Sequence, residues 1–475
     1  MRPKKDIKSL FFLGIGGIGM SAIARYFQRN GERVLGYDRT CSPLSKELEN
    51  EGIAITYIDS PAWVEEQGIS PCDTLVVRTP AVPESNAIYT HLRTQGYDIV
   101  KRSEVLGLIT RQKKALCVAG THGKTTTSAI LAHIMHESKQ GASAFLGGIS
   151  NNYQSNLVMD KDSNYVVVEA DEFDRSFHHL TPHSSIITSI EPDHLDIYGD
   201  SKGYQEGFDR YAELVENFIV LKAGFHLSNA RLKAKVFTYT GPKEEGTNAD
   251  FYADNIRVED GEIRFDFCVS ERTGLPFRSI KDVQLGVPIW VNIENSVAAM
   301  AIAALYETDT RQIRDGVKSF EGVWRRFNIH LRTPQVAYID DYAHHPTELN
   351  AAIQSVRKVY SHRAVWAVFQ PHLYTRTRDF MDDFADVLSK TDKLILLPIY
   401  PAREEPIEGI TSEALAQKVK EHNPNSDVVV VGKDALIEYL KEHVQNSRNP
   451  IVLITLGAGD IDRLVNPIKE ALNQL

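Results

Sequence analysis

The chain has 475 residues, of which 42% are hydrophobic and 24% are charged, and its formal net charge is -10. This length predicts about three domains, and the composition is typical of a globular protein. The acidic balance argues against a nucleic-acid-binding protein, and no later apolar run is long enough to span a membrane. The four cysteines are far apart and form neither a zinc pattern nor a disulfide framework, so we expect a cytoplasmic location.

Strand and helix patterns alternate over the first hundred residues. Residues 9–16 predict a buried strand, 20–31 a helix, and 33–38 and 73–79 two more strands. Such alternation predicts a parallel sheet with helices on both faces, which binds ligands at the carboxyl ends of its strands.

A glycine-rich stretch follows the first strand, with Gly14, Gly16, Gly17 and Gly19 in six positions. Its G-x-G-x-x-G spacing is typical of a nucleotide-binding loop, but a structural turn or the apolar part of a signal peptide gives a similar pattern. The complete strand–helix–strand unit around the glycines argues against a signal peptide. The glycines alone do not separate a phosphate loop from a turn.

A second glycine loop carries a stronger signal, because it lies between the strand of residues 113–120 and a helix within 121–137. Its backbone N–H groups and the helix N-terminus favour phosphate, Lys124 is positioned for the β- and γ-phosphates, and the Thr125 hydroxyl for Mg²⁺. Only two residues separate Gly120 from Gly123, so a generic P-loop NTPase is a poor match. The alternative is a Gly-Lys turn without a ligand.

Two later strands end in groups that bind cations. Glu169 directly follows three valines, and His194 follows the next strand. Because carboxyl ends of neighbouring parallel strands meet at one edge, we expect both beside the phosphate loop, as metal ligands. The alternatives are a solvated acidic loop and a structural histidine.

The remainder of the chain predicts a hairpin over 251–269 with an Asp-Gly turn, a helix near 292–307, and a third strand–helix unit from about residue 332. Residues 272–288 and 325–335 are expected to be loops. We predict an α/β protein of three domains: a Rossmann-like domain over 1–107, a central P-loop-type domain with a mixed sheet over 108–331, and a second Rossmann-like domain over 332–475.

Several motifs in this order resemble the Mur ligases of peptidoglycan synthesis. The first are Gly-Thr-His-Gly-Lys-Thr-Thr from residue 120, Glu-Ala-Asp-Glu from residue 169 and Glu-Pro-Asp-His-Leu-Asp from residue 191. "GVWRRF", "DDYAHHPTE", "FQPHLYTRTRDF" and "YPAREEPIEG" resemble the alanine-adding branch of that family. The resemblance extends through most of the chain.

The resemblance implies that the first glycine loop binds the pyrophosphate of UDP-N-acetylmuramate through Gly16, Gly17, Ile18 and Gly19, with Asp38 near the uridine. It also implies ATP at the second loop and two Mg²⁺ ions on Thr125, Glu169 and His194. The expected ATP-binding residues are Gly120, Thr121, His122, Gly123, Lys124, Thr125, Thr126, Asn292, Asn295, Arg326 and Asp341. Val291 stands where the family usually has histidine, and a helix N-cap is an equal alternative for Asn292.

In the third domain the resemblance implies a site for L-alanine. Arg376 is expected to bind its carboxylate, because an arginine fork can make two parallel hydrogen bonds. Tyr342, His344, His372 and Arg378 are expected around it. The expected catalytic residues are Lys124, His194, Arg326, which is expected to contact the γ-phosphate across a domain cleft, and Arg376.

The implied reaction is an ATP-dependent amide synthesis, in which the lactyl carboxylate of UDP-N-acetylmuramate forms an acyl phosphate and L-alanine displaces phosphate. A ligase that adds a whole tripeptide to the same sugar nucleotide is the nearest alternative. An NAD-dependent dehydrogenase would explain the first hundred residues, but it leaves Lys124, Glu169 and Arg376 without a role. The sequence does not indicate an oligomeric state.

Overall fold

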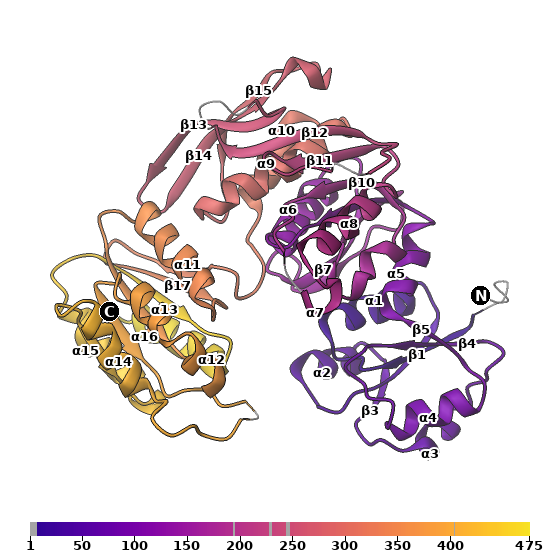
Figure 1. The fold of residues 1–475 in the computed structure, drawn as a ribbon, viewed down its shortest axis with the longest axis horizontal. Coiled ribbons are helices and arrows are strands. Elements are labelled where there is room, and N and C mark those ends of the chain that lie inside the picture. The colour runs from indigo at the N-terminus through magenta and orange to yellow at the C-terminus, as the bar shows by residue number, and fades with distance from the viewer. Residues whose placement is uncertain (1–6, 193–194, 228–229, 244–247, 403) are drawn as a thin grey trace. The chain divides into compact units, whose positions relative to one another are not determined.

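The computed structural model describes residues 7–192, 195–227, 230–243, 248–402 and 404–475. Helices and strands form three sheet regions along the chain (Figure 1). The chain divides into two compact units, one of residues 1–254, 267–281 and 294–320, and one of residues 255–266, 282–293 and 321–475. The predicted α/β class with three sheet regions is confirmed, while the domain boundaries after residues 107 and 331 stay predictions.

The first sheet has five parallel strands in the order β3-β2-β1-β4-β5. Its elements are β1 (Ser9–Leu13), α1 (Ile18–Arg29), β2 (Arg33–Tyr37), α2 (Pro43–Asn50), β3 (Ala54–Thr56), α3 (Pro61–Glu66), β4 (Thr74–Arg78), α4 (Ala87–Thr94), β5 (Asp98–Lys101) and α5 (Arg102–Thr110). The central strand β1 is buried along its whole length, which explains its continuous apolar run. It ends earlier than predicted, because Gly14 takes φ +85° and turns the chain.

The second sheet is mixed and has ten strands, in the order β15-β14-β13-β12-β11-β10-β6-β9-β7-β8. Its strands are β6 (Lys114–Ala119), β7 (Ser143–Ser150), β8 (Ser155–Val158), β9 (Tyr165–Glu169), β10 (Pro182–Ile187), β11 (Phe218–Lys222), β12 (Lys235–Pro242), β13 (Phe251–Glu259), β14 (Glu262–Val269) and β15 (Ser279–Gln284). Its helices are α6 (Lys124–His136), η1 (Phe173–His179), α7 (Leu195–Tyr198), α8 (Ser201–Ala212), η2 (Glu271–Thr273), α9 (Trp290–Leu305) and α10 (Thr310–Ser319).

One predicted loop of this region is wrong and one predicted hairpin is confirmed. Strand β15 lies inside the segment 272–288 that the sequence predicts as loop. Asp282 takes φ 54° within β15, and the buried Ile280 and Val283 are therefore three positions apart, which removes the alternation of a strand. Strands β13 and β14 flank the turn at Asp260 and Gly261, as predicted.

The third sheet has the order β16-β17-β21-β18-β19-β20, with β16 antiparallel to β17 and the other pairs parallel. Its elements are β16 (Asn328–Arg332), β17 (Val336–Asp341), α11 (Pro346–Val359), β18 (Ala364–Phe369), α12 (Tyr374–Asp379), α13 (Met381–Leu388), β19 (Lys393–Leu396), α14 (Ser412–His422), β20 (Val428–Val430), α15 (Lys433–Gln445), β21 (Ile451–Leu456), η3 (Asp460–Leu464) and α16 (Val465–Asn473). The predicted loop at 325–335 is wrong, because β16 lies within it. This edge strand shows no alternation of buried and exposed residues, so its sequence carries no strand signal.

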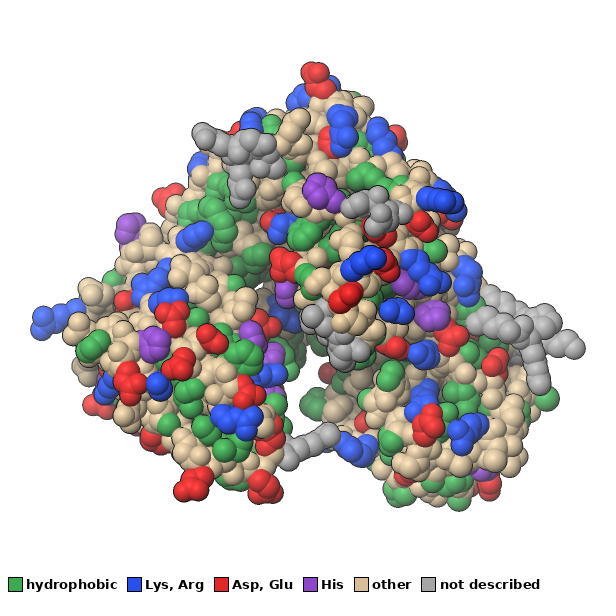
Figure 2. Space-filling model, in the orientation of Figure 1, with side chains coloured by type: hydrophobic (Ala, Val, Ile, Leu, Met, Phe, Trp, Pro, Cys, Tyr) green, Lys and Arg blue, Asp and Glu red, His purple; other side chains and the backbone are tan. Residues whose placement is uncertain are grey.

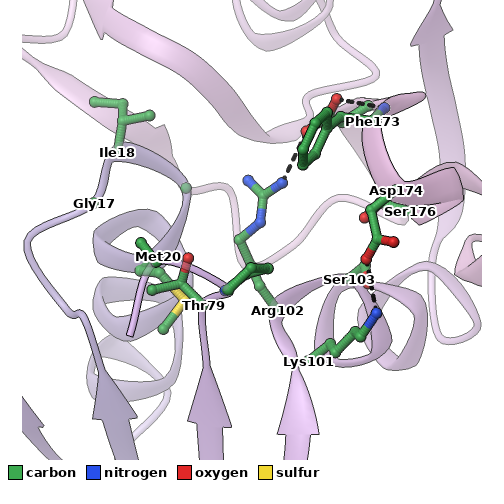
Figure 3. Close-up of a pocket in the computed structure, with 14 residues that line it drawn as sticks. Gly17, Ile18, Met20, Thr79, Lys101, Arg102, Ser103, Phe173, Asp174 and Ser176 are labelled. Carbon is green, nitrogen blue, oxygen red and sulfur yellow. Dashed lines mark hydrogen bonds and ion pairs between the residues drawn. The ribbon is translucent and has the colours of Figure 1, made fainter. Parts of the chain in front are cut away.

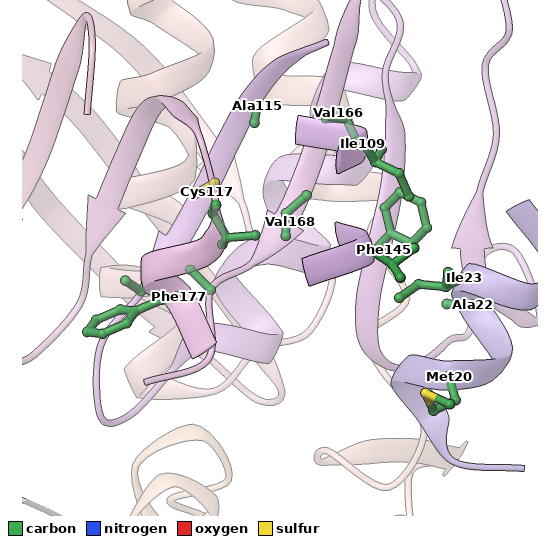
Figure 4. Packing of buried hydrophobic residues seen from close by; sticks show 14 of the residues in the cluster. Met20, Ala22, Ile23, Ile109, Ala115, Cys117, Phe145, Val166, Val168 and Phe177 are labelled. Atoms are coloured by element: carbon green, nitrogen blue, oxygen red, sulfur yellow. The ribbon is translucent and has the colours of Figure 1, made fainter. Parts of the chain in front are cut away.

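Within the first compact unit, helix α1 packs against the second sheet. Ala22 and Ile23 on α1 lie beside Phe145 of β7 (Figure 4), and all three side chains are buried. Apolar contacts therefore continue from the first sheet into the second. The glycine loop at the start of α1 is held close to the second sheet by this packing.

A buried guanidinium joins the same two elements. Arg25 on α1 is 2% exposed and donates from Nη1 to Asn156 Oδ1 of β8 at 2.6 Å, while its other nitrogens bond Glu47 and Glu51. The Asn156 amide nitrogen donates in turn to the carbonyl of Ile18 and to Ser21 Oγ. Buried hydrogen bonds therefore tie the first turn of α1 to β8.

Charged side chains of both signs are interspersed over the face of the molecule in Figure 2. In the part of the chain that the structure describes, no helix is both long enough and apolar enough to cross a membrane.

We expect Asn156→Ala to lower the free energy of unfolding by about 2–3 kcal/mol, because Arg25 Nη1, the Ile18 carbonyl and Ser21 Oγ lose buried partners. Urea denaturation followed by tryptophan fluorescence measures this change. Lys46→Ala, on the exposed side of α2, is the control and should shift stability by less than about 0.5 kcal/mol. Equal shifts in the two variants would contradict a structural role for Asn156.

Candidate active site

The first glycine loop combines strained turns with free helix-start amides. A Cβ on Gly14 would lie 2.4 Å from Thr79 Cγ2, so the fold itself requires this glycine. Gly17 differs: its φ of -69° is ordinary, and a Cβ there would meet no described atom closer than 3.6 Å. The amides of Ile18 and Gly19 belong to the first turn of α1 and have no intrahelical acceptor. The loop can therefore bind an anion. The fold does not require a glycine at position 17.

Asp38 fixes the shape of this loop. One carboxylate oxygen accepts from Gly16 N at 2.8 Å and the other from Thr40 N at 3.1 Å. Its predicted contact with uridine stays a prediction. The structure assigns it a local role that the sequence analysis did not include.

A cavity of about 360 Å³ opens beside the loop, and we call it the Arg102 cavity. Arg102 extends from the start of α5 and pairs with Asp171 at 3.2 Å, while Lys101 pairs with Asp174 at 2.7 Å (Figure 3). A Cβ on Gly19 would lie 2.1 Å from Arg102 Nη1, so this glycine leaves room for the guanidinium. The cavity is lined by Gly17, Ile18, Gly19, Met20, Thr79, Pro80, Ala81, Lys101, Arg102, Ser103, Asp171, Phe173, Asp174 and Ser176.

Sequence reasoning missed Lys101 and Arg102. The available signal was their place at the carboxyl end of a strand, but β5 has only four residues and was not predicted. A second cavity, of about 170 Å³, shares Ile18, Gly19, Arg102 and Asp171 with the first and is also lined by Glu169. The two cavities therefore connect the glycine loop with the end of β9.

The second glycine loop has the geometry of a phosphate loop. Gly120 takes φ +132°, where a Cβ would lie 2.1 Å from Thr188 Oγ1, and Gly123 takes φ +81° at the N-cap of α6. Thr121 Oγ1 donates to the carbonyl of Glu191 at 2.7 Å, and His122 N donates to Ser189 Oγ at 3.0 Å. Thr126 lies in the first turn of α6 and is half-buried. The loop is thus tied to the residues after β10 and ends at a helix N-terminus.

Lys124 is held by an ion pair that the sequence did not predict. Its Nζ lies 2.8 Å from Glu172 Oε2 and donates to the carbonyls of Gly120 and Thr121. Glu172 is 2% exposed; burial raises the pKa of its carboxyl, and the Lys124 ammonium opposes that rise. Sequence analysis noted Glu172 only as part of an acidic segment. An incoming phosphate must compete with this carboxylate for Lys124.

Thr125 and Glu169 meet as predicted for a metal site. Thr125 Oγ1 donates to Glu169 Oε1 at 3.2 Å, which brings two hard oxygen donors to the end of β9. Oxygen ligands of this kind suit Mg²⁺. His194, the third predicted ligand, lies outside the described residues. Among the residues that are described, no cluster of three or more His, Cys, Asp or Glu is arranged to hold a metal.

The two asparagines on α9 have packing contacts. Asn295 Oδ1 accepts from Thr127 Oγ1 at 3.1 Å and lies 3.0 Å from where a Cβ on Gly123 would be, so it braces the second loop. Asn292 Nδ2 donates to the carbonyl of Val287 at 3.1 Å. Helix α9 begins at Trp290, so the N-cap alternative for Asn292 is wrong. Binding of adenine by this pair stays a prediction.

In the second compact unit, predicted residues gather at the ends of β17 and β18. His344 donates from Nδ1 to the Tyr342 carbonyl at 3.0 Å, and its ring lies 6.0 Å from that of His372. Arg376 Nη1 lies 3.3 Å from His372 Nδ1. Burial lowers the pKa of both histidines, so they are neutral at pH 7. The four side chains make a small polar cluster with one fixed positive charge.

Neighbouring residues support this cluster. His372 stacks on Tyr400 at 5.7 Å, which the sequence analysis did not select. Burial raises the pKa of Asp341 to about 6, and its carboxylate accepts from Ala343 N at 2.7 Å. Arg378 pairs with the adjacent Asp379 at 2.8 Å and is half-exposed. Its predicted role in substrate binding stays a prediction.

The loop before β16 holds Arg326 between two residues in the left-handed region, Arg325 at φ 58° and Phe327 at φ 55°. The Arg325 guanidinium is buried against Asp340 at 3.3 Å and fixes this loop. Arg326 itself is exposed. Strained backbone of this kind is common at functional sites.

Three family models match the chain in the order in which its sheets occur. They are the Mur ligase family catalytic domain over residues 10–114, the Mur ligase middle domain over 118–303, and the Mur ligase glutamate ligase domain over 325–459. The chain belongs to the Mur ligase family.

Particular relatives are similar over their full length. The UDP-N-acetylmuramate–L-alanine ligase of Porphyromonas gingivalis is 49% identical over 473 residues, covering 99% of this chain and 100% of the relative. The ligase of the same name from Parabacteroides distasonis is 50% identical, covering 98% and 97%. The crystal structure of UDP-N-acetylmuramate–alanine ligase from Thermotoga maritima matches with a TM-score of 0.77 at 25% identity, covering 98% of this chain and 99% of that one. A murein peptide ligase from Psychrobacter arcticus shares the fold, with a TM-score of 0.63 at 20% identity and the same coverage.

We expect Glu172→Gln to bind ATP more tightly, with a Kd roughly five- to tenfold lower, because the phosphates no longer compete with a carboxylate for Lys124. The same change should lower the midpoint of thermal unfolding, since a half-buried ammonium loses its counter-ion. Calorimetric titration with ATP measures the first effect.

The matched control is Glu191→Gln. It removes an equal charge beside the same loop, where Glu191 lies 3.6 Å from His122 and is mostly exposed. ATP affinity in this control should change less than twofold. Unchanged or weaker binding in Glu172→Gln would show that the carboxylate does not compete with nucleotide.

Proposed function

We propose that this protein is an ATP-dependent ligase that joins L-alanine to the lactyl carboxylate of UDP-N-acetylmuramate, in peptidoglycan synthesis. The observation that carries this proposal is identity of 49–50% over the whole chain with ligases of that name. The two glycine loops, the oxygen pair of Thr125 and Glu169 and the polar cluster around Arg376 supply the chemistry. A dehydrogenase would use the first glycine loop, but it would leave the second loop, the oxygen pair and the polar cluster without a role.

The reaction requires ATP because a carboxylate does not react with an amine in water. Transfer of the γ-phosphoryl group to the lactyl carboxylate forms an acyl phosphate and releases ADP. The amine of alanine then attacks the carbonyl carbon, and phosphate leaves from the tetrahedral intermediate with the amide bond formed. Phosphoryl transfer of this kind depends on positioning and on neutralising charge.

ATP binds at the second glycine loop in this proposal. Amides at the start of α6 face its phosphates, and Lys124 exchanges Glu172 for phosphate oxygens. Thr125 and Glu169 would hold Mg²⁺, with His194 as a further ligand. The metal ion, when bound, neutralises charge on the transferring phosphoryl group. Contact of Arg326 and Asp341 with ATP, and of Asn292 and Asn295 with adenine, is part of the same proposal.

UDP-N-acetylmuramate binds in the Arg102 cavity in this proposal, with its pyrophosphate on the amides of Ile18 and Gly19. Arg102 and Lys101 line this cavity, where each is paired with one carboxylate that the pyrophosphate would replace. The smaller connected cavity leads towards Glu169, and this is the direction in which the lactyl carboxylate must point. The site therefore spans from the first loop to the metal-binding oxygens.

L-alanine binds at the cluster of the second unit in this proposal. The Arg376 fork takes the carboxylate, and Nε2 of neutral His344 accepts from the ammonium group. His372, whose Nδ1 faces Arg376, lies beside them. Tyr342 restricts the space for the side chain. Because the substrates are metabolites of the cell interior and the four cysteines are free thiols, we place the protein in the cytoplasm.

The proposal is tested by measuring phosphate release with UDP-N-acetylmuramate, ATP and Mg²⁺, in parallel with L-alanine or with the L-alanyl tripeptide. We expect turnover with L-alanine at least about a hundredfold above that with the tripeptide, and no turnover when the sugar nucleotide is omitted. Lys124→Ala is the control for release by a contaminant and should be inactive. Preference for the tripeptide would favour the muropeptide ligase instead.

We expect Gly17→Val to weaken UDP-N-acetylmuramate binding at least about tenfold while ATP affinity is unchanged, because only a ligand at the loop would meet the new side chain. The fold should tolerate it, since nothing described lies within 3.6 Å of that Cβ. Calorimetric titrations with each nucleotide measure both affinities. Gly14→Val is the contrasting variant and should lower the midpoint of thermal unfolding. Normal sugar-nucleotide binding by Gly17→Val would place the pyrophosphate elsewhere.

A further inference from the structure

A larger cavity, of about 700 Å³, lies beside β4 and β5, and we call it the Arg93 cavity. Residues from β4, α4, β5, η1 and α7 line it, and no residue of the first glycine loop does so. It shares Pro80, Lys101, Phe173 and Asp174 with the Arg102 cavity; Lys101, Phe173 and Asp174 are labelled in Figure 3. The function proposed above uses neither Arg78 nor Arg93.

Two guanidinium groups in this cavity share one aromatic ring. The Arg78 Cζ lies 4.1 Å from the centroid of the Tyr89 ring, and the Arg93 Cζ lies 5.4 Å from it. Tyr89 is 8% exposed, so the ring is held in place by the core of the first sheet. Cation–π contacts of this type orient guanidinium planes. Nε and Nη2 of Arg78 donate to the Val82 carbonyl at 3.1 and 2.7 Å, so Nη1 is the nitrogen of this side chain that is left for a ligand.

Positive charge is in excess in this cavity. Lys101 is neutralised by Asp174, and Glu104 accepts from the backbone amide of Lys101. The carboxylate of Glu84, which is 75% exposed, lies 3.9 Å from Arg78. Among the described residues, no Asp or Glu lies within 4 Å of the Arg93 nitrogens. Two guanidinium groups thus stand close together without a buried counter-ion.

The other walls are aromatic and aliphatic. Tyr97, Phe173, Ile99 and Ile197 line the cavity. Phe173 is 43% exposed, which is unusual for a large apolar side chain at a cavity edge. Tyr97 directs its hydroxyl to the carbonyl of Ile69 at 2.9 Å and so leaves its ring to the cavity wall. The volume falls in the range of sites for small organic ligands.

We infer that the Arg93 cavity is a second ligand site, which binds a phosphate monoester carried on a planar ring. Arg93 would take the phosphate through paired N–H groups, as guanidinium forks do, and Arg78 would add a hydrogen bond from Nη1. Tyr89, Tyr97 and Phe173 would take the ring by offset or edge contacts. An occupant would also touch the Lys101–Asp174 pair, which forms part of the wall of the Arg102 cavity.

The test is a calorimetric titration of the full chain with 4-nitrophenyl phosphate, with and without saturating UDP-N-acetylmuramate and a non-hydrolysable ATP analogue. We expect binding of about one equivalent that neither nucleotide displaces. Arg93→Gln should weaken it about tenfold, since a charge-assisted hydrogen bond is lost from an exposed helix position that does not affect folding. Arg29→Gln, in the last turn of α1 and outside every cavity described above, is the matched control and should bind as the unaltered chain does.

Three further titrations complete the test. Inorganic phosphate and 4-nitrophenol should each bind at least about tenfold more weakly than the ester, because each lacks half of the recognised chemistry. Uridine monophosphate and adenosine monophosphate are titrated with the nucleotide sites blocked, to show whether the ring is that of a nucleoside. Tighter binding than that of the ester identifies the ligand as a nucleotide. Weaker binding identifies it as another ring-bearing phosphate. Displacement by UDP-N-acetylmuramate, equal affinity in Arg93→Gln, or equal affinity for inorganic phosphate would overturn the inference.

Discussion

A single buried guanidinium ties helix α1, which begins at the first glycine loop, to the second sheet of the first compact unit. The Arg25 guanidinium is buried and donates to Asn156. The Asn156 amide nitrogen donates in turn to Ile18 and Ser21 in the first turn of α1. Desolvating these groups is costly unless every partner is in place, so the arrangement is stable only in one geometry. The first glycine loop, at the start of α1, therefore faces the end of β9 at a fixed separation. The two connected cavities between them exist because of that constraint.

The two glycine loops have related backbone geometry but differ in which residues supply their positive charge. The first has no lysine of its own and obtains positive charge from Lys101 and Arg102 on a separate element. The second carries Lys124 at the start of α6, where Glu172 pairs with it. An unpaired cation in either place would repel neighbouring cations, or it would lose its hydration without gaining an ion pair in exchange. Each loop is thus prepared for an anion, and each cation has a temporary partner.

The second compact unit uses a different device for its polar cluster. His344 and His372 are kept neutral by burial, while Arg376 retains its charge next to them. A cluster with one cation and two neutral imidazoles matches the two charged ends of an amino acid, because the fork takes the carboxylate and an imidazole can accept from the ammonium. The third sheet places these groups together because β17 and β18 run parallel and end at the same edge.

The sequence alone predicts the α/β class and most of the helices and strands, and it proposes the residues that carry the chemistry. Some features depend only on neighbouring residues in the chain, and local sequence patterns therefore predict them. They include the apolar runs, the turn at Gly14 and the position of Lys124 at the start of a helix. The sequence also predicted that Thr125 and Glu169 lie close together, because both lie at the carboxyl ends of neighbouring parallel strands. Strands β15 and β16 were missed, since a left-handed residue and half-burial removed their alternation.

The partners of the buried charged groups are set by tertiary packing. Lys124 and Glu172 are 48 residues apart, and Arg25 and Asn156 are 131 apart, so neither pair leaves a mark in any local pattern. Arg102 and Lys101 follow a strand too short to recognise, and the Arg93 cavity takes its lining from elements that lie about a hundred residues apart at their extremes. Burial and charge balance select such partners after the sheets have assembled. The physical reason is that desolvation depends on everything that surrounds a group, whereas backbone preference depends on its neighbours in the chain.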